Sequence, residues 1–371
     1  MELKNKVISI ESDVGRINPK DFSPEQKALQ LKVKNVYNAI EKEAHKQYVE
    51  LGKIYRSKEK KPTPPKPTPS PTPSPIPNPT PTDNSFYVAY DNSAQRWVNE
   101  NPNHKDLASI AYIAKVPAFN WLGNWNTDVR DFVARICKEA KAQGKIALFI
   151  IYNIPGRDNG SHSSGGAGSP EAYRKFVMDI VSGIDDAKAW VIVEPDASAL
   201  SLNLNNPTLI KERFEMLNTA LDILRTRPNV KIGIDASHPE WIQNVDELVP
   251  LLRKAGLDRA DFVSINVSNF VDLSKCEEYA RKIFERTGKR SVIDTSRNGN
   301  GTWSNPNNEA EPWLNPPGRA IGKLPQVFSS GPVLAYVWAK RPGESDAPVR
   351  GGPNAGEFWP QYAIDLVKNA K

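Results

Sequence analysis

The sequence is poor in histidine and cysteine and has no long apolar run, and each shortage excludes a class of function. Four of its 371 residues are histidine and two are cysteine, with no close spacing among them. A zinc centre needs a cluster of such ligands, so we expect no metal and no cofactor. No apolar run is long enough to span a membrane. The glycines of GSHSSGGAG at 160–168 lack the lysine of a phosphate loop and fit a mobile loop over a cleft better.

The two cysteines and the N-terminus leave the compartment open. Cys137 and Cys276 fall in segments of helical periodicity, where we expect unpaired thiols that pack as small apolar groups. The first 15 residues lack the apolar core of a secretory signal peptide. Export therefore requires either a signal that was removed or another route.

The net charge of +6 is confined to the N-terminal part of the chain. Residues 1–66 hold 15 lysines and arginines against 9 acidic residues, whereas residues 67–371 hold 34 of each. The high pI is therefore no argument that the main domain binds a polyanion, and we expect no nucleic-acid partner.

A proline-rich stretch divides the chain into three parts. Residues 62–81 include 11 prolines among 20 residues, which favours a semi-rigid polyproline II spacer. We expect an N-terminal segment at 1–61, a linker at 62–84 and a main domain at 85–371. Apolar residues recur at spacings of three and four from Leu29 to Tyr55, which predicts one amphipathic helix. Its apolar face suggests pairing with residues 1–20, self-association or a protein partner. For the linker, a tail that merely projects from the surface is the alternative to joining two modules.

Short apolar runs alternate with helical stretches after the linker. This order is typical of a parallel sheet covered on both faces, and the number of runs favours a distorted parallel α/β barrel of about seven strands. The predicted strands are 108–115, 147–153, 190–196, 230–235, 261–269, 291–297 and 333–340. The clearest predicted helices are 171–184, 209–224 and 244–255.

Polar residues stand at the carboxyl ends of most predicted strands. Asp196 ends the third strand and Asp235 the fourth, while Asp346 follows the last. In parallel α/β barrels this edge builds the active site, and helix capping explains any single residue but not the set. Converging carboxyl groups without a metal or a Ser-His pair indicate acid/base chemistry, as glycoside hydrolysis requires. Tryptophans in the same loops stack on sugar rings or pack within the loops.

From about Ser85 to Lys371 the chain resembles glycoside hydrolase family six, the inverting β-1,4-glucanases that include endoglucanases and cellobiohydrolases. Its motifs appear in family order over the whole domain: YNIPGRD (152–158), HSSGG (162–166), VIVEPD (191–196), DASHPEW (235–241), NVSNF (266–270), VIDTSRNGNG (292–301), PGRAIG (317–322) and WAKRPGESD (338–346).

The resemblance implies a role for each matching residue. Asp196 is the general acid, and Asp158 keeps its pKa high and helps to position water. Asp346 is the base, or else a water relay through Ser164 and Asp158 removes the proton. Tyr152 lies below the distorted sugar. The remaining matches are expected to bind the β-1,4-glucan, and they are Trp121, Arg157, Asp235, His238, Trp241, Asn269, Trp313, Lys340 and Glu344.

Loop lengths and missing cysteines distinguish this chain within the family. The segments after Trp241 and Asp346 are short, which predicts an open cleft and endoglucanase action. The alternatives are a cellobiohydrolase and a non-catalytic glucan-binding protein. We also expect the protein to be extracellular. The family commonly carries cysteines at positions comparable to Asn159, Leu314 and 347–348, and none occurs here. Ser237 replaces a usual glycine.

Overall fold

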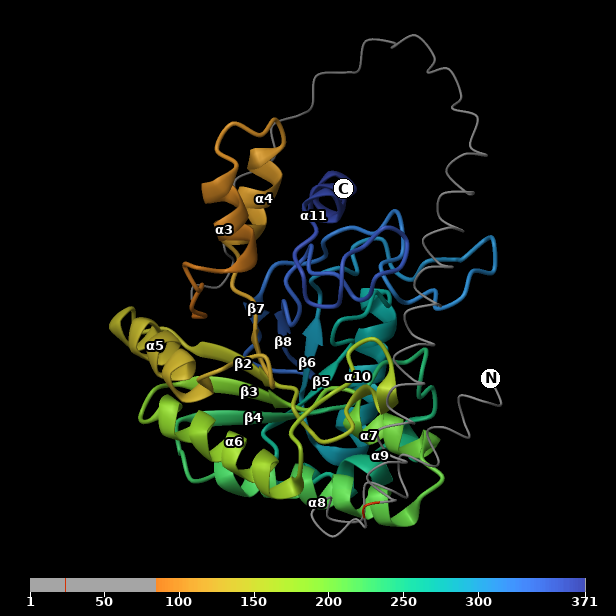
Figure 1. The fold of residues 1–371 in the computed structure, drawn as a ribbon. Coiled ribbons are helices and arrows are strands. Elements are labelled where there is room, and N and C mark those ends of the chain that lie inside the picture. The colour runs from red at the N-terminus through yellow and green to blue at the C-terminus, as the bar shows by residue number, and fades with distance from the viewer. Residues whose placement is uncertain (1–23, 25–84, 371) are drawn as a thin grey trace. The chain divides into compact units, whose positions relative to one another are not determined.

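The computed structural model describes residue 24 and residues 85–370. The predicted N-terminal helix and the proline-rich linker lie outside the described residues. The chain divides into two units, Met1–Ser74 and Pro75–Lys371, and the second is described below. In it, a curled, mostly parallel sheet carries helices on its outer side (Figure 1).

The sheet confirms the predicted distorted parallel α/β barrel. Seven strands run parallel, and the short β7 pairs antiparallel with β8 at one edge. A hydrogen bond from the Phe119 amide to the Trp338 carbonyl (2.9 Å) brings the two ends of the sheet together. In sheet order the strands are β1 (Asn120–Leu122), β2 (Ala147–Ile151), β3 (Ala189–Val193), β4 (Val230–Asp235), β5 (Phe262–Ile265), β6 (Ser291–Asp294), β8 (Val333–Val337) and β7 (Gln326–Val327).

Alternate residues of each strand serve two separate cores. Phe149 of β2 packs outward against the helices, whereas its neighbour Ile150 points inward with Trp190 and Phe262. A Cβ at Gly233 would lie 2.1 Å from the Phe262 ring, so glycine is needed there to admit the ring. The inside of the barrel is therefore packed with side chains, and the polar residues are left at its carboxyl end.

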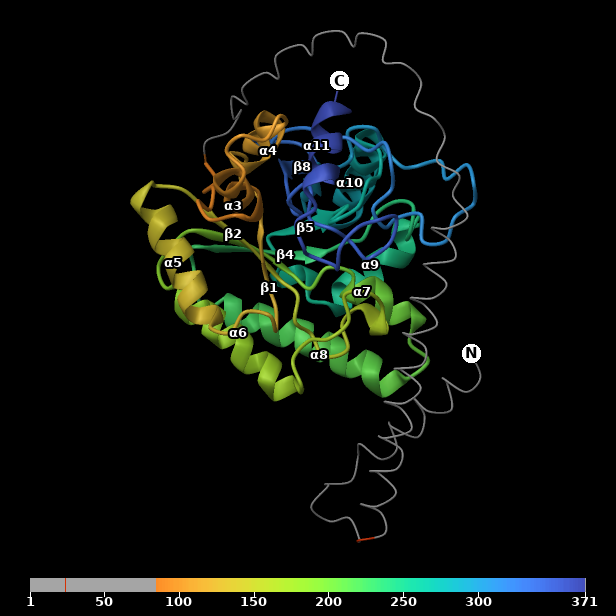
Figure 2. The same cartoon turned by 45° about the horizontal axis from the view of Figure 1, so that its top comes forward.

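The helices form two groups around the sheet. Helices α5, α6 and α8 pack side by side, whereas α3, α4 and α11 form a separate cluster (Figures 1 and 2). None of the described helices is long and apolar enough to cross a bilayer. The helices are α3 (Ser93–Glu100), α4 (Leu107–Ala114), α5 (Val129–Ala142), α6 (Pro170–Ile184), α7 (Ala197–Leu200), α8 (Pro207–Leu224), α9 (Val245–Lys254), α10 (Leu273–Thr287) and α11 (Pro360–Lys368).

One predicted strand is wrong. Residues 108–115 form α4, which buries Ile110 and Ile113 on one side against α3 and α11. A short continuous apolar run fits a buried helix as well as a buried strand, and the sequence pattern alone does not separate them. The true first strand, β1, has only three residues and carries Trp121 itself. The three clearest predicted helices are confirmed as α6, α8 and α9. Both cysteines are free and buried, as expected.

Candidate active site

The backbone is strained where the parallel strands end. Six non-glycine residues of the sequence motifs at this edge have a positive φ, a conformation that costs roughly 1–3 kcal/mol and persists only where surrounding contacts enforce it. Such strain concentrates at functional sites. The residues are Asp158 (58°), Glu194 (47°), Asp196 (69°), Ser237 (59°), Asn266 (67°) and Ser268 (59°).

Asp196 and Asp235 lie side by side at the ends of β3 and β4. The buried Asp235 carboxylate accepts hydrogen bonds from the amides of Asp196 (3.0 Å) and Ser237 (3.0 Å) and from the Ser264 hydroxyl (3.1 Å). Burial raises the pKa of Asp235 to about 6, and these donors limit the increase because they favour its charged form. Burial, and then the charges of Asp235 and Asp158, raise the pKa of Asp196 well above its usual range. Of the two carboxyl groups, Asp196 is therefore the one better suited to keep a proton.

Asp158 lies close to this pair, on the loop that follows β2. Its Oδ2 accepts a hydrogen bond from the Ser163 amide at 2.7 Å. Burial raises the pKa of Asp158, and the charge of Glu311 adds to this increase. After burial, the charges of Asp196 and Asp158 also raise the pKa of the buried Tyr152 hydroxyl, which places Tyr152 beside both carboxyl groups.

Arg157 fastens the same loop from within. Its Nε donates to the Ser163 carbonyl (2.7 Å), and its Nη1 donates to the Tyr152 carbonyl and to Asn124 Oδ1 (both 2.9 Å). Its Nη2 reaches the carbonyl of the exposed Ser164 at 3.3 Å. Every guanidinium nitrogen thus has a protein partner. Direct substrate binding by Arg157 stays a prediction, and loop support is what its contacts provide.

Asp346 has the opposite environment, next to the ends of β6 and β8. Arg297 pairs with both of its oxygens (3.0 and 2.9 Å), and Lys340 lies 2.7 Å from Oδ1. The backbone amide of Asn315 donates to Asp346 Oδ2 (3.0 Å), and the Asn315 side-chain Oδ1 accepts a hydrogen bond from the Asp346 backbone amide (2.8 Å). Burial alone would raise the pKa of Asp346, but the two cations hold it below its usual range. Asp346 is therefore a fixed carboxylate.

Trp121 connects the two carboxyl clusters. Its ring meets the Tyr152 ring edge to face, with centroids 5.3 Å apart. Its indole Nε1 donates to the carbonyl of Ala339 at 2.8 Å, next to Lys340. The acid cluster and the Asp346 cluster therefore lie at the same end of the barrel, on either side of β1.

The other predicted binding residues surround these clusters. Trp241 and Trp313 are 37% and 57% exposed, as stacking platforms would be. The His238 ring lies 6.0 Å from that of Trp241, and burial lowers the pKa of His238 to about 4, so it is neutral. Asn269 donates to the Val267 carbonyl (3.0 Å), and Glu344 accepts from the Ser93 hydroxyl (2.9 Å).

Sequence reasoning did not assign several residues that build the site. Glu194, two residues before Asp196, is 1% exposed, and its Oε1 accepts a hydrogen bond from the Asn153 backbone amide at 2.8 Å. Burial raises the pKa of Glu194 to about 7. Its place beside Asp196 in VIVEPD was the available signal. Arg213 and Asn315 had no such signal, since their contacts are distant in sequence. In residues 85–370 no three metal-binding side chains gather as a metal site needs.

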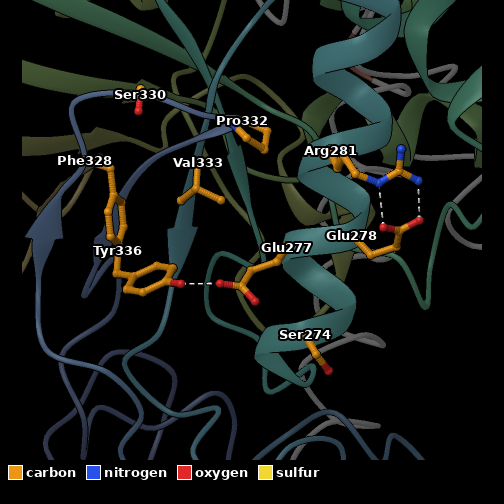
Figure 3. A pocket seen from close by; sticks show the side chains of 9 residues that line it. All are labelled: Ser274, Glu277, Glu278, Arg281, Phe328, Ser330, Pro332, Val333 and Tyr336. Atoms are coloured by element: carbon orange, nitrogen blue, oxygen red, sulfur yellow. Dashed lines mark hydrogen bonds and ion pairs between the residues drawn. The ribbon is translucent and has the colours of Figure 1, made fainter.

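A separate groove lies outside the barrel, between α10 and the β7–β8 pair (Figure 3). Its volume is about 480 Å³. Tyr336 donates to Glu277 across it, and Arg281 pairs with Glu278 at 2.6 Å (Figure 3). None of the predicted site residues lines this groove, so the chemistry belongs to the strand ends.

These features define a class. A carboxyl group whose pKa is raised, a second whose pKa is lowered, and exposed tryptophans at the carboxyl end of a parallel barrel are the equipment of a hydrolase that uses general acid/base catalysis on a sugar polymer.

Comparison with known proteins identifies the family. The profile described as glycosyl hydrolases family 6 matches residues 81–370, and the chain belongs to this family. Endoglucanase 1 of Streptomyces halstedii is 36% identical over 295 residues, which cover 76% of this chain and 88% of that protein. Endoglucanase A of Cellulomonas fimi is 38% identical over 274 residues, or 72% of this chain, and the match spans only 57% of that protein.

A solved structure agrees with this assignment. The endoglucanase Cel6 of Mycobacterium tuberculosis, determined with methyl-cellobiosyl-4-deoxy-4-thio-β-D-cellobioside, superposes with a TM-score of 0.72 at 37% identity. The match covers 78% of this chain and 98% of that one. The family resemblance, the fold and the expectation of a glycoside hydrolase are thereby confirmed.

Proposed function

We propose that residues 85–371 form an inverting endo-β-1,4-glucanase that cleaves internal bonds of cellulose or a related β-glucan, with Asp196 as general acid. The observation that carries this proposal is the raised pKa of Asp196, which comes from burial and from the carboxylates of Asp235 and Asp158. A donor must hold its proton at working pH to protonate the leaving oxygen.

Endo action is supported by the relatives and by the loops. Four bacterial relatives with identities from 31% to 38% are named endoglucanases. A protein named probable cellobiohydrolase C, from Aspergillus fumigatus, is 26% identical. The short segments after Trp241 and Asp346 also favour an open cleft over a tunnel. A cellobiohydrolase is the alternative, and cellobiose as the sole early product would favour it.

Two groups are candidates for the catalytic base, and they differ in proton affinity. Asp346 is ionised, but Arg297 and Lys340 make it a weak proton acceptor. The raised pKa of Asp158 suits it better to take a proton from water relayed past Ser164. We favour the relay. Asp158→Asn should then lower kcat on cellotetraose at least as much as Asp346→Asn, and the reverse order would favour Asp346 as the direct base.

The product anomer and the Asp196→Asn variant test the main proposal. Hydrolysis of cellohexaose, followed by NMR, should release the α-anomer first, because inversion converts a β bond to an α product. Asp196→Asn should lower kcat by roughly 10²–10⁴-fold without loss of folding or of oligosaccharide binding. A β-anomer as first product would refute inversion, and a wild-type rate in the variant would refute the role of Asp196.

The surroundings of the enzyme form a further part of this proposal. An extracellular location is supported by the polymeric substrate, which is too large to enter a cell. For residues 1–61 we propose docking to a protein partner or self-association, because the predicted helix has an apolar stripe in a basic segment. Sedimentation of the full chain should reveal a dimer or a complex with cell-surface components, and a monomer in every case would end this idea.

A further inference from the structure

Arg213 reaches from α8 to the loop that carries Asp158. It is 5% exposed, and its Nη2 donates to the Gly156 carbonyl (3.2 Å) and to Asn159 Oδ1 (2.9 Å). The Nδ2 of Asn159 in turn donates to the carbonyl of Leu200 at 3.2 Å. Leu200 ends α7, the short helix that begins directly after Asp196. One guanidinium thus ties both sides of Asp158 to the helices behind the general acid.

The loop needs an external tie because its backbone is strained. Asp158 and Asn159 have φ values of 58° and 45°, so two successive non-glycine residues are left-handed. Such a pair persists only where surrounding contacts enforce it. Asp158 itself receives the Ser163 amide, a contact within the same loop. The tie from the loop to α8 comes from Arg213.

A charge at this position on α8 has no packing reason. The neighbouring Phe214 and Leu217 belong to the apolar core that α8 buries against the sheet. Burying a guanidinium costs free energy unless its hydrogen bonds compensate. The hydrogen bonds to the loop and the charge of the buried Glu194 are the interactions that offset this cost, and only the hydrogen bonds reach the loop.

We propose that Arg213 is a positioning residue for the hydrolysis proposed above, which holds the 156–159 loop so that Asp158 stays beside Asp196. The inference rests on the proposed function for its kinetic consequences. Its structural consequence, the rigidity of the loop, can be measured without any substrate.

Four variants separate the tie from general packing. Arg213→Met roughly keeps the side-chain volume and removes the hydrogen-bond donors. Arg213→Lys keeps the positive charge and loses the forked guanidinium that reaches two acceptors. Asn159→Gly removes the acceptor on the exposed loop and accepts the left-handed backbone without strain. Asn159→Asp keeps an acceptor oxygen for Arg213 but loses the donor to the Leu200 carbonyl, so it tests the Arg213 contact by itself. Arg227→Met is the matched control, because Arg227 lies just beyond α8 and bonds to the Val181 carbonyl (3.2 Å) instead.

We expect kcat on cellotetraose to fall about tenfold to a hundredfold in Arg213→Met and Asn159→Gly, because small displacements of catalytic groups have effects of this size. KM should change less than about threefold, and Asn159→Asp and Arg227→Met should remain near wild type. Amide hydrogens of residues 157–164 should exchange faster with deuterium in the two damaged variants only.

The pH profile provides a readout that packing alone does not move. Hydrolysis needs protonated Asp196, so kcat/KM falls as the pH rises through the pKa of Asp196. The charge of Asp158 helps to raise that pKa. A displaced Asp158 should therefore shift the alkaline limb of the profile to lower pH in Arg213→Met.

The outcomes distinguish the two proposals. If Arg213→Met lowers the melting temperature but leaves kcat, the alkaline limb and the loop exchange unchanged, Arg213 is only structural and the inference is overturned. If wild-type protein hydrolyses no β-glucan, the proposed function fails, while the exchange measurement still decides whether Arg213 holds the loop.

Discussion

The carboxyl groups on the two sides of Trp121 are chemically alike and differ in their neighbours. Asp196 faces two other aspartates, and no hydrogen bond to its carboxyl group is present among the described residues. Asp346 faces Arg297 and Lys340 and accepts a backbone amide as well. A neighbouring negative charge raises the pKa of a carboxyl group and a neighbouring positive charge lowers it, and burial strengthens both effects. One active-site edge thereby keeps an acid and a carboxylate at the same pH.

The two sides should also respond oppositely to pH in their stability. A lowered pKa in the folded state gives stability that is present above the unfolded pKa and is lost as pH falls. A raised carboxyl pKa gives stability at low pH that is lost as pH rises. Asp346 belongs to the first case and Glu194 to the second. The largest predicted effects follow from this contrast.

Removing a cation from Asp346 should have the largest effect. Arg297→Met leaves a buried carboxylate short of its bidentate partner, and we expect a loss of about 3–5 kcal/mol in unfolding free energy at pH 7. The loss should shrink as the pH falls below the usual range of an aspartate, because Asp346 then becomes neutral. Urea unfolding at pH 7 and pH 3 measures both.

Two further variants serve as controls for this loss. Adding both Asp346→Asn and Lys340→Met to Arg297→Met should restore part of the stability, because none of the three buried charges then remains. Arg281→Met, in an exposed pair with Glu278, should cost less than about 1 kcal/mol. An Arg297→Met loss no greater than that of the control would mean that Asp346 is not held by this pair.

The stability that Glu194 contributes, in the cluster around Asp196, should change with pH in the opposite direction. Burial raises its pKa to about 7, so the folded protein binds this proton at pH values where the unfolded chain has released it. Glu194 should therefore contribute a fall of about 3 kcal/mol in stability between the usual glutamate range and pH 7, at 1.36 kcal/mol per pKa unit. Glu194→Gln should remove this part of the slope and leave the part that Asp196, Asp235 and Asp158 contribute. Identical pH dependence in both proteins would show that Glu194 titrates elsewhere.

Removing the neighbouring negative charge of Asp235 should have a smaller effect, which appears in the pH dependence of the rate. Asp235→Asn takes away the neighbouring carboxylate, so the pKa of Asp196 should fall and the alkaline limb of kcat/KM should move to lower pH. Above the limb, kcat/KM should fall roughly tenfold below the wild-type rate. Rates across pH on cellotetraose measure the limb, and an unshifted limb with normal folding would exclude Asp235 as a cause.

The contrast between the clusters was only partly predictable from sequence. Asp196, Asp235 and Asp346 stand directly after apolar strands or near them, so a local pattern plus barrel geometry indicates a common edge. Which of them holds a proton depends on Arg297, on Asn315 and on backbone amides. Those contacts span up to 49 positions in the chain. Residue order carries no local trace of them.

For the fold as well, elements set by local sequence were predictable, and elements set by distant contacts were not. The long amphipathic helices α6, α8 and α9 follow from periodicity. The apolar run of α4 does not, because burial against α3 and α11 decides its conformation, and the three-residue β1 is too short to leave a pattern. Arg213 looked like any polar residue on a helix until its loop partner was known.

The smallest effect concerns a contact that joins loops from the two sides. His162 Nε2 lies 3.2 Å from both carboxylate oxygens of Glu311. His162 belongs to the loop that carries Asp158, whereas Glu311 precedes Trp313. The side chains are 31% and 38% exposed, so their coupling should be below about 1 kcal/mol.

A double-mutant cycle with His162→Gln and Glu311→Gln should find that each single change alters KM on cellohexaose less than about fivefold, with kcat nearly constant. The double variant should resemble either single one, because both remove the same contact. Strictly additive effects would mean that the loops act independently. A large fall in kcat would instead place this contact within the acid cluster, since the charge of Glu311 also reaches Asp158.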